Sequence, residues 1–177
     1  MTNRIHHQHH ITQASSQDLI IHIGTLFRQT TPLENIWPDV LETIRTAIPC
    51  LSVSVWSVEP ETTILTCVQA VGDGQITLDG YQVQADHMIP GRTIMQNDVL
   101  CIADVRQHDG DISAFEKHVG TEIHAVLSLP LQIAGNVCGE LILLDEAVGR
   151  FSEDEAQLLE PVSVMLALAL KTSTLGH

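Results

Sequence analysis

The sequence EIHAVLSLPLQIAGNVCGELILLD at residues 122–145 contains two strand-like runs joined by the tripeptide Ala134-Gly135-Asn136. Alternation of side chains between two faces is typical of a β-strand, and a short segment with glycine and asparagine between two such runs indicates a hairpin. In the first run, one face carries Ile123, Ala125, Leu127 and Leu129, and the other carries His124, Val126 and Ser128. The stretch therefore predicts the closing hairpin of an antiparallel sheet, with strands at 122–132 and 136–145.

A long helix is predicted directly after this hairpin, in FSEDEAQLLEPVSVMLALAL at residues 151–170. Ser152 and Glu155 have the spacing of a capping box, and the acidic pair Glu153 and Asp154 favours the positive end of the helix dipole. The apolar stripe that we expect to face the sheet consists of Leu158, Leu159, Val162, Met165, Leu166 and Ala169.

A second apolar edge of this helix predicts an additional partner, because a helix that is apolar on more than one face needs a further surface to cover it. This edge carries Pro161, Val164 and Leu168. We expect it to pair with the first helix of the chain in a two-fold helical bundle, and so to form a homodimer. The predicted interface residues are Leu19, Ile23, Leu26, Val164 and Leu168.

The remainder of the chain predicts helices first and strands afterwards. Apolar residues at helical spacing indicate helices over 15–29 and 32–48, the second opened by a capping box at Thr31 and Glu34, with Pro38 causing a kink or a restart. Strands are expected at 51–58, 62–71, weakly at 76–86, and at 99–102, with a short helix at 91–96. Residues 103–121 are expected to be loop with one helical turn around Phe115.

This order predicts a single α+β domain over residues 15–173, with an antiparallel sheet covered by helices. Residues 15–48 form its N-terminal helices, 51–145 its sheet and pocket loops, and 152–172 its C-terminal helix. Residues 1–14 are rich in His and Gln and are expected to be a disordered tail.

Composition excludes two classes of partner. The chain has 177 residues, 22 acidic and 8 basic, which gives a net charge of −14. Nucleic-acid binding requires clustered Lys and Arg, and here these residues are scattered. The sequence has neither a signal peptide nor an apolar run long enough for a membrane span. The four cysteines stand apart in the sequence, which is typical of free thiols in a cytoplasmic protein.

Four segments, in order and at the expected spacing, resemble the GAF domain, a small-molecule sensing module of signalling proteins. They are PLENIWPDVLETI, Ile89-Pro90-Gly91 opening a helix, CIADV, and GELILLDEAVGRFSEDEAQLLEPVSVMLALAL. The resemblance covers roughly residues 15–172. It implies a GAF fold with a central antiparallel sheet of five to six strands, N- and C-terminal helices on one face, and a helix and loop insertion over the other face.

The specialised branches of the family match less well. The region DISAFEKHVGTE keeps Phe115 but lacks the rest of the motif of cyclic-nucleotide-binding GAF domains. No Cys-His pair precedes the last hairpin, so a covalently attached bilin is not expected. Free methionine-R-sulfoxide reductases are similar around IADVRQHDGDISAF, but their reactive cysteines align near Asp86, Met95 and Ala114, and their substrate carboxylates in the last strand align with Ile142 and Leu144.

The resemblance implies a ligand pocket between the sheet and residues 86–124. The candidate ligand-binding residues are Trp56, His87, Arg92, Cys101, Asp104, Phe115, His118, Glu122 and His124. His118 and His124 are candidate haem ligands, although solvent-exposed loop histidines would explain them equally. Pro90-Gly91 with Arg92 is a candidate site for a small oxyanion such as nitrate, although an ordinary helix start would also explain it.

The sequence therefore favours a non-enzymatic sensory domain that binds a small ligand and signals through its terminal helices. We expect it to act in a two-component or other signal-transduction system, with a histidine kinase or another output domain as partner. The alternative from a different class is a methionine sulfoxide reductase-like or thiol redox enzyme that uses Cys101 and Cys138. A third possibility is a degenerate domain that serves only for dimerisation.

Overall fold

The computed structural model describes residues 17–29, 32–73 and 78–174. The predicted tail at 1–14 and the predicted cap at Thr31 lie outside these ranges. None of the helices in the described part of the chain combines the length and the apolar character that a membrane crossing requires.

A six-stranded antiparallel sheet forms the centre of the molecule, with the strand order β3-β2-β1-β6-β5-β4. The strands are β1 (Ser52–Val58), β2 (Ile64–Gly72), β3 (Gln82–Gln84), β4 (Leu100–Ile102), β5 (Ala125–Ile133) and β6 (Asn136–Asp145). The hairpin predicted at Ala134-Gly135-Asn136 joins β5 to β6, and both Ala134 and Gly135 have a positive φ. Such angles are typical of the tight turns whose twist matches that of the flanking strands.

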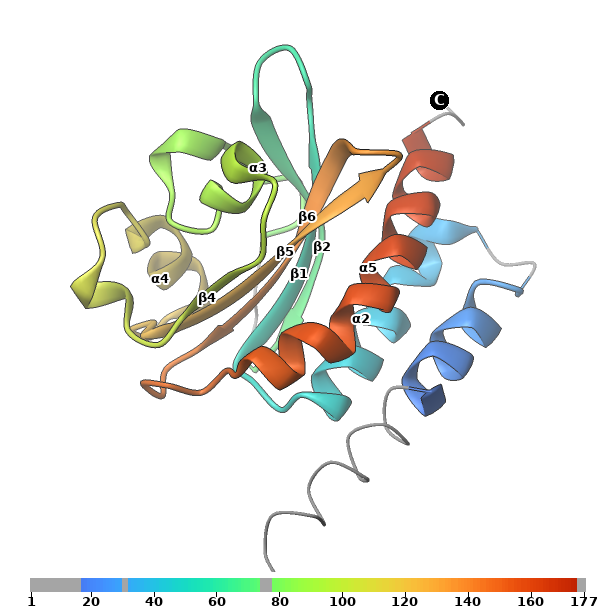
Figure 1. The fold of residues 1–177 in the computed structure, drawn as a ribbon, viewed down its shortest axis with the longest axis horizontal. Helices are drawn as coiled ribbons and strands as arrows, with labels where there is room; N and C mark the ends of the chain where they lie inside the picture. The colour runs from blue at the N-terminus through green and yellow to red at the C-terminus, as the bar shows by residue number, and fades with distance from the viewer. Residues whose placement is uncertain (1–16, 30–31, 74–77, 175–177) are drawn as a thin grey trace, which may run out of the picture.

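Helices cover one face of the sheet, as Figure 1 shows. They are the helical residues 17–26, α2 (Trp37–Ala47) and α5 (Glu153–Thr174), with a short 3-10 helix, η1 (Leu33–Asn35), before α2. Pro38 lies in the first turn of α2, so it marks a restart of the helix and not a kink. The capping box of α5 is present: the Ser152 amide donates to Glu155 Oε2 at 2.9 Å, and the Glu155 amide lies 3.4 Å from Ser152 Oγ.

The insertion covers the opposite face, to the left of the sheet in Figure 1. It comprises η2 (Ala85–His87), α3 (Arg92–Gln96), η3 (Val105–Gln107) and α4 (Ser113–Val119). Helix α4 has seven residues where one turn was expected, because Asp111 accepts hydrogen bonds from the amide and hydroxyl of Ser113, and Gly120 closes the helix in the left-handed conformation.

The two faces of the sheet bury two separate cores. Val53 and Val55 of β1 face the helices, whereas Trp56 faces the insertion, as the alternation predicts. The prediction that Ile123 shares the face of Ala125, Leu127 and Leu129 is wrong, because Ile123 precedes β5 and packs in the insertion core. The insertion core therefore lies where the resemblance implied a ligand pocket.

Candidate functional site

A carboxylate lies in the middle of the insertion-facing side of the sheet. Strand alternation points Glu140, Ile142 and Leu144 of β6 toward the insertion, and Leu141 and Leu143 toward the helices. Glu140 pairs with Trp56 on β1 and with Pro130 on β5, so the strands enclose it from both sides.

The Glu140 side chain is completely buried and is only partly hydrogen-bonded. Ser128 Oγ donates to Glu140 Oε2 at 3.0 Å, whereas Oε1 has no hydrogen-bond partner. Burial raises the pKa of this carboxyl to about 8, and the Ser128 hydroxyl lowers it only in part. The carboxyl is therefore mostly protonated at neutral pH.

Aromatic side chains close one flank of this carboxyl. Trp56 is fully buried and its indole Nε1 donates to Ser54 Oγ at 2.8 Å. Its ring lies 5.5 Å from the Phe115 ring and 6.4 Å from the Tyr81 ring, measured between centroids. Two of the predicted site residues, Trp56 and Phe115, are thus brought together, and both act as walls of the insertion core.

Helix α3 covers the sheet over β5 and β6. Thr93 on this helix is buried and its hydroxyl has no hydrogen-bond partner. The helix approaches its surroundings closely, since a Cβ added at Gly91 would lie 2.0 Å from the Ala85 carbonyl oxygen. Only glycine fits there.

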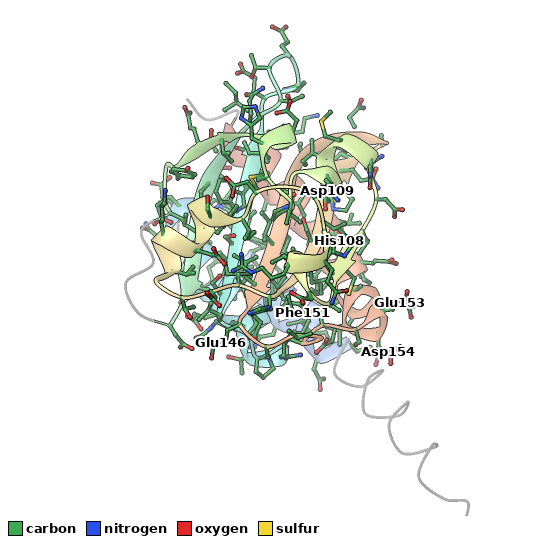
Figure 2. All side chains as sticks on the ribbon, turned by 90° about the vertical axis from the view of Figure 1, so that its left-hand side faces the viewer. His108, Asp109, Glu146, Phe151, Glu153 and Asp154 are labelled. Atoms are coloured by element: carbon green, nitrogen blue, oxygen red, sulfur yellow. The ribbon has the colours of Figure 1, made fainter. Side chains whose placement is uncertain are left out.

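The predicted oxyanion site at the start of α3 is not supported by the geometry. The amides of Arg92, Thr93 and Ile94 already donate to the carbonyl oxygens of Ile89, Pro90 and Gly91. The Arg92 guanidinium donates to the carbonyl of Asp109, a residue labelled with His108 on the insertion loops in Figure 2. The backbone donors that an anion would need are therefore in use.

The structure describes the side chain of His124, one of the two histidines proposed as haem ligands. Its Nδ1 lies 3.1 Å from Asp104 Oδ1 and its Nε2 lies 3.8 Å from Glu122 Oε2. The hydrogen bond from His124, together with the Arg106 amide, lowers the pKa of Asp104. A haem ligand needs an imidazole nitrogen that faces iron in an apolar cavity, and both nitrogens of His124 face carboxylates. The His118 side chain lies outside the described structure.

Three further predicted site residues are at the surface. The His87 side chain is 73% exposed, and its nearest acidic partner is the neighbouring Asp86. Cys101 is exposed on the edge strand β4. Glu122, with 80% of its side chain exposed, also does not face the insertion core. The described members of the predicted set are thus buried (Trp56, Phe115), partly exposed (Arg92, Asp104, His124) or exposed (His87, Cys101, Glu122).

A model of the GAF domain matches residues 32–170 of this chain. The protein belongs to the GAF family. This agrees with the observed architecture of a six-stranded antiparallel sheet with helices on one face and an insertion over the other. No curated protein sequence matches the chain.

Several solved GAF structures share the fold. The GAF domain from the Acinetobacter phosphoenolpyruvate-protein phosphotransferase is 12% identical, with a TM-score of 0.76 over 98% of this chain and 97% of that one. Free methionine-R-sulfoxide reductase from Neisseria meningitidis, in complex with its substrate, is 13% identical, with a TM-score of 0.75 over 100% and 98%. A phycoerythrobilin-bound GAF domain from a cyanobacterial phytochrome is 18% identical, with a TM-score of 0.70 over 93% and 99%. Because these proteins differ in what they bind, the likeness defines the fold alone.

The cysteines of this GAF domain are not arranged as a reactive pair. Cys101 pairs with Leu127, whereas Cys138 forms a bulge opposite Leu131. The two cysteines are thus separated by four residues along β5 and by two strand spacings, or roughly 13 Å by 10 Å. A disulfide needs Cα atoms within about 7 Å. Burial also raises the pKa of both thiols, which disfavours the reactive thiolates.

The bulge also changes the direction of Cys138. Its Sγ lies 3.3 Å from the Leu131 carbonyl oxygen and 3.8 Å from that of Ala167 on α5. Cys138 therefore faces the helices, although its two-residue spacing from Glu140 would place both on one face of a regular strand. A β-bulge adds a residue to one strand and so inverts the alternation locally.

The polar groups inside the insertion core were not among the sequence candidates. They are Ser52, Ser54, Thr93, Ser128 and Glu140. A signal for Glu140 did exist, since it alternates with Ile142 and Leu144 and is a carboxylate on an otherwise apolar face. Thr93 gave no such signal, because only the packing of α3 shows that its hydroxyl is buried.

Proposed function

We propose that this GAF domain is a non-enzymatic sensory domain that binds a small ligand between its sheet and the α3–α4 insertion. The observation that carries the proposal is the incomplete hydrogen bonding of Glu140 in a fully buried position. Buried polar atoms are nearly always paired in folded proteins, because an unpaired one costs roughly 1–3 kcal/mol. Such a cost is compensated when a ligand supplies the partner.

A route for signalling runs through β6. Gly139, the residue before Glu140, packs so closely that an added Cβ would lie 2.0 Å from the Trp56 carbonyl oxygen and 2.7 Å from Leu170 Cδ2 on α5. The backbone of β6 at Gly139, the residue before the buried carboxyl, therefore contacts the Leu170 side chain of α5. A displacement of β6 by a ligand would reach α5 through this one side chain.

The exposed edge of α5 is the proposed output surface. Val164 and Leu168 are 53% and 54% exposed, whereas Leu26 is half-buried. Leu19 and Ile23 are buried in the core of the protomer, so they are not available for the dimer interface that we expected them to form. We retain a homodimer through the α5 edge and the transfer of the signal to a histidine kinase or another output domain.

Ligand binding and its coupling to α5 are tested together. A panel of small metabolites is screened for those that raise the melting temperature of the wild-type protein. Hydrogen exchange of residues 162–172 is then compared with and without the stabilising compound, with the β2 strand as an internal reference. We expect the exchange of α5 to change and that of β2 to stay constant. Stabilisation with no change in α5 would refute the proposed signalling route.

The proposed dimer is tested by light scattering at high micromolar concentration. We expect a dimer for the wild type and a monomer for a double variant with Val164→Ser and Leu168→Ser. Gln107→Ser, at an exposed position of η3 on the insertion side of the sheet, is the control and should remain dimeric. A monomeric wild type would exclude this interface.

A further inference from the structure

Two unpartnered oxygens lie on opposite walls of the insertion core. On the sheet, Glu140 Oε1 is buried without a hydrogen-bond partner, and on α3 the same holds for Thr93 Oγ1. The exposed fractions of the two residues are 0% and 1%. Neither atom can be satisfied by solvent at the surface.

Helix α3 lies over the end of the sheet that carries Glu140. Asn97, one helical turn after Thr93, donates from its side-chain amide to Gln132 Oε1 at 3.3 Å. Gln132 is two residues beyond Pro130, which pairs directly with Glu140. Asn97 is the C-cap of α3 in the left-handed conformation, so this bond holds the C-terminal end of α3 over this end of β5. Thr93 lies in the first turn of the same helix, which contacts both β5 and β6.

The chemistry of the Glu140 carboxyl restricts what can bind it. The described neighbours of this carboxyl are uncharged: Trp56 and Pro130 pair with Glu140, and Ser128 Oγ donates to it. Helix α3, which contacts β5 and β6, carries the buried and uncharged Thr93. The nearest titratable group on its own strand, Cys138, faces α5. No ion pair to Glu140 exists among the described residues. The carboxyl is therefore favoured in its neutral form, which is both a donor and an acceptor.

The bond to Ser128 favours one position of the proton. When Ser128 Oγ donates to Oε2, the neutral acid carries its hydrogen on Oε1. Oε1–H is then a donor without an acceptor, while Oε2 retains a second lone pair. A carboxylic acid in this state is complementary to a group with an adjacent carbonyl and N–H.

We propose that Glu140 and Thr93 form the recognition site for a small neutral ligand that presents an amide or lactam edge. The ligand carbonyl accepts from Glu140 Oε1, the ligand N–H donates to Glu140 Oε2, and the Thr93 hydroxyl supplies a further hydrogen bond from the α3 side. This inference rests on the proposed sensory function and names the class of ligand. Anionic ligands are disfavoured, because no described cation pairs with the site, and cationic ligands are disfavoured, because Glu140 would have to ionise and both charges would be buried.

The site opens by a displacement of α3. This helix has five residues, and it is tied to its surroundings by the Asn97–Gln132 hydrogen bond and by the bond from Arg92 to the Asp109 carbonyl. Few bonds must therefore break for a ligand to enter between α3 and the sheet.

The test uses 2-pyrrolidinone as a lactam probe, with ethylammonium and acetate as charged probes at constant ionic strength. Chemical shifts of the Glu140 side-chain carboxyl and of the Thr93 amide are followed by NMR during each titration. We expect 2-pyrrolidinone to perturb both resonances in a saturable manner, and the charged probes to leave both unchanged. The affinity for the lactam should fall about tenfold per pH unit above the pKa of Glu140, since ionisation removes the donor.

Three variants separate recognition from folding. Glu140→Gln keeps a donor and an acceptor, so lactam binding should persist but lose its pH dependence. Glu140→Met has a similar volume and no hydrogen-bonding oxygen, so binding should be lost while the fold is retained. Ser52→Ala is the matched control, because the Ser52 hydroxyl is also buried and unpartnered but pairs in register with Leu144, away from Glu140. It should bind as the wild type does.

Two results would overturn the inference. A saturable response to ethylammonium or acetate, with none to the lactam, shows that the site binds a ligand of another class and leaves the sensory function standing. No response at Glu140 or Thr93 to any probe also overturns it. In that case, the metabolite screen and the hydrogen exchange of α5 decide separately whether the sensory function fails as well.

Discussion

Replacing Glu140 by Gln should remove a pH-dependent loss of stability that a single buried carboxyl imposes on the fold. In the unfolded chain this carboxyl ionises near its ordinary pKa of 4.5, whereas in the folded protein burial raises the pKa to about 8. Between these two values the unfolded state has released a proton that the folded state still holds. The free energy of unfolding therefore decreases as the pH rises.

The magnitude follows from the two pKa values. Each pH unit between them lowers the free energy of unfolding by about 1.4 kcal/mol, so the loss reaches roughly 3 kcal/mol at pH 7 and about 5 kcal/mol above pH 8. The stabilising contribution of the protonated form is fully present below pH 4.5. A glutamine side chain has the same shape and does not titrate. The free energy of unfolding of the Glu140→Gln variant should therefore not show this pH-dependent loss.

Urea unfolding of the wild type and of Glu140→Gln, measured from pH 5 to pH 9, tests this calculation. The difference in free energy between the two proteins should grow in favour of the variant up to about pH 8 and then remain constant. Glu160→Gln, the same change at an exposed position of α5, is the control and should follow the wild type. A difference that stays constant from pH 5 to pH 8 would show that Glu140 is already ionised in the folded protein.

Two further substitutions test the fold, and a thiol-labelling experiment tests the redox alternative. Ser152→Ala should lower the free energy of unfolding by about 1 kcal/mol in urea denaturation, because it removes half of the capping box of α5; an unchanged midpoint would contradict this role. Gly139→Ala should cost about 2–3 kcal/mol by the same measurement, since its Cβ would overlap the Trp56 carbonyl oxygen; a variant as stable as the wild type would show that the strand spacing adapts. Native-state labelling with a thiol reagent should modify Cys101 first, because Cys50 and Cys67 are buried and burial raises the pKa of Cys50 to about 12; rapid reaction of all four thiols would contradict the described packing.

The local sequence was sufficient to predict most of the secondary structure. The closing hairpin, the capping box at Ser152 and Glu155, and the second apolar edge at Val164 and Leu168 are all present in the structure. These features depend on residues within a few positions of one another, and period, turn chemistry and capping report such short-range geometry directly.

Predictions that depended on the position of a residue in space were less accurate. Ile123 continues the alternation of β5 in the sequence but packs on the other face, and Cys138 is turned by a bulge that the sequence does not mark. Leu19 and Ile23 have the spacing of an interface stripe, yet the protomer's own core buries them. Periodicity identifies an apolar face without identifying the surface that covers it.

By itself, the sequence determined the α+β class and the GAF resemblance. Only the tertiary structure decided which polar groups are buried without a hydrogen-bond partner, because their partners must come from β1, β5, β6 and α3, which meet only in the folded domain. Glu140 is one of many acidic residues in the chain, and its neighbours in the sequence do not determine its burial. It is singled out by complete desolvation next to Trp56, Ser128 and Pro130, a property that exists only once the strands have paired.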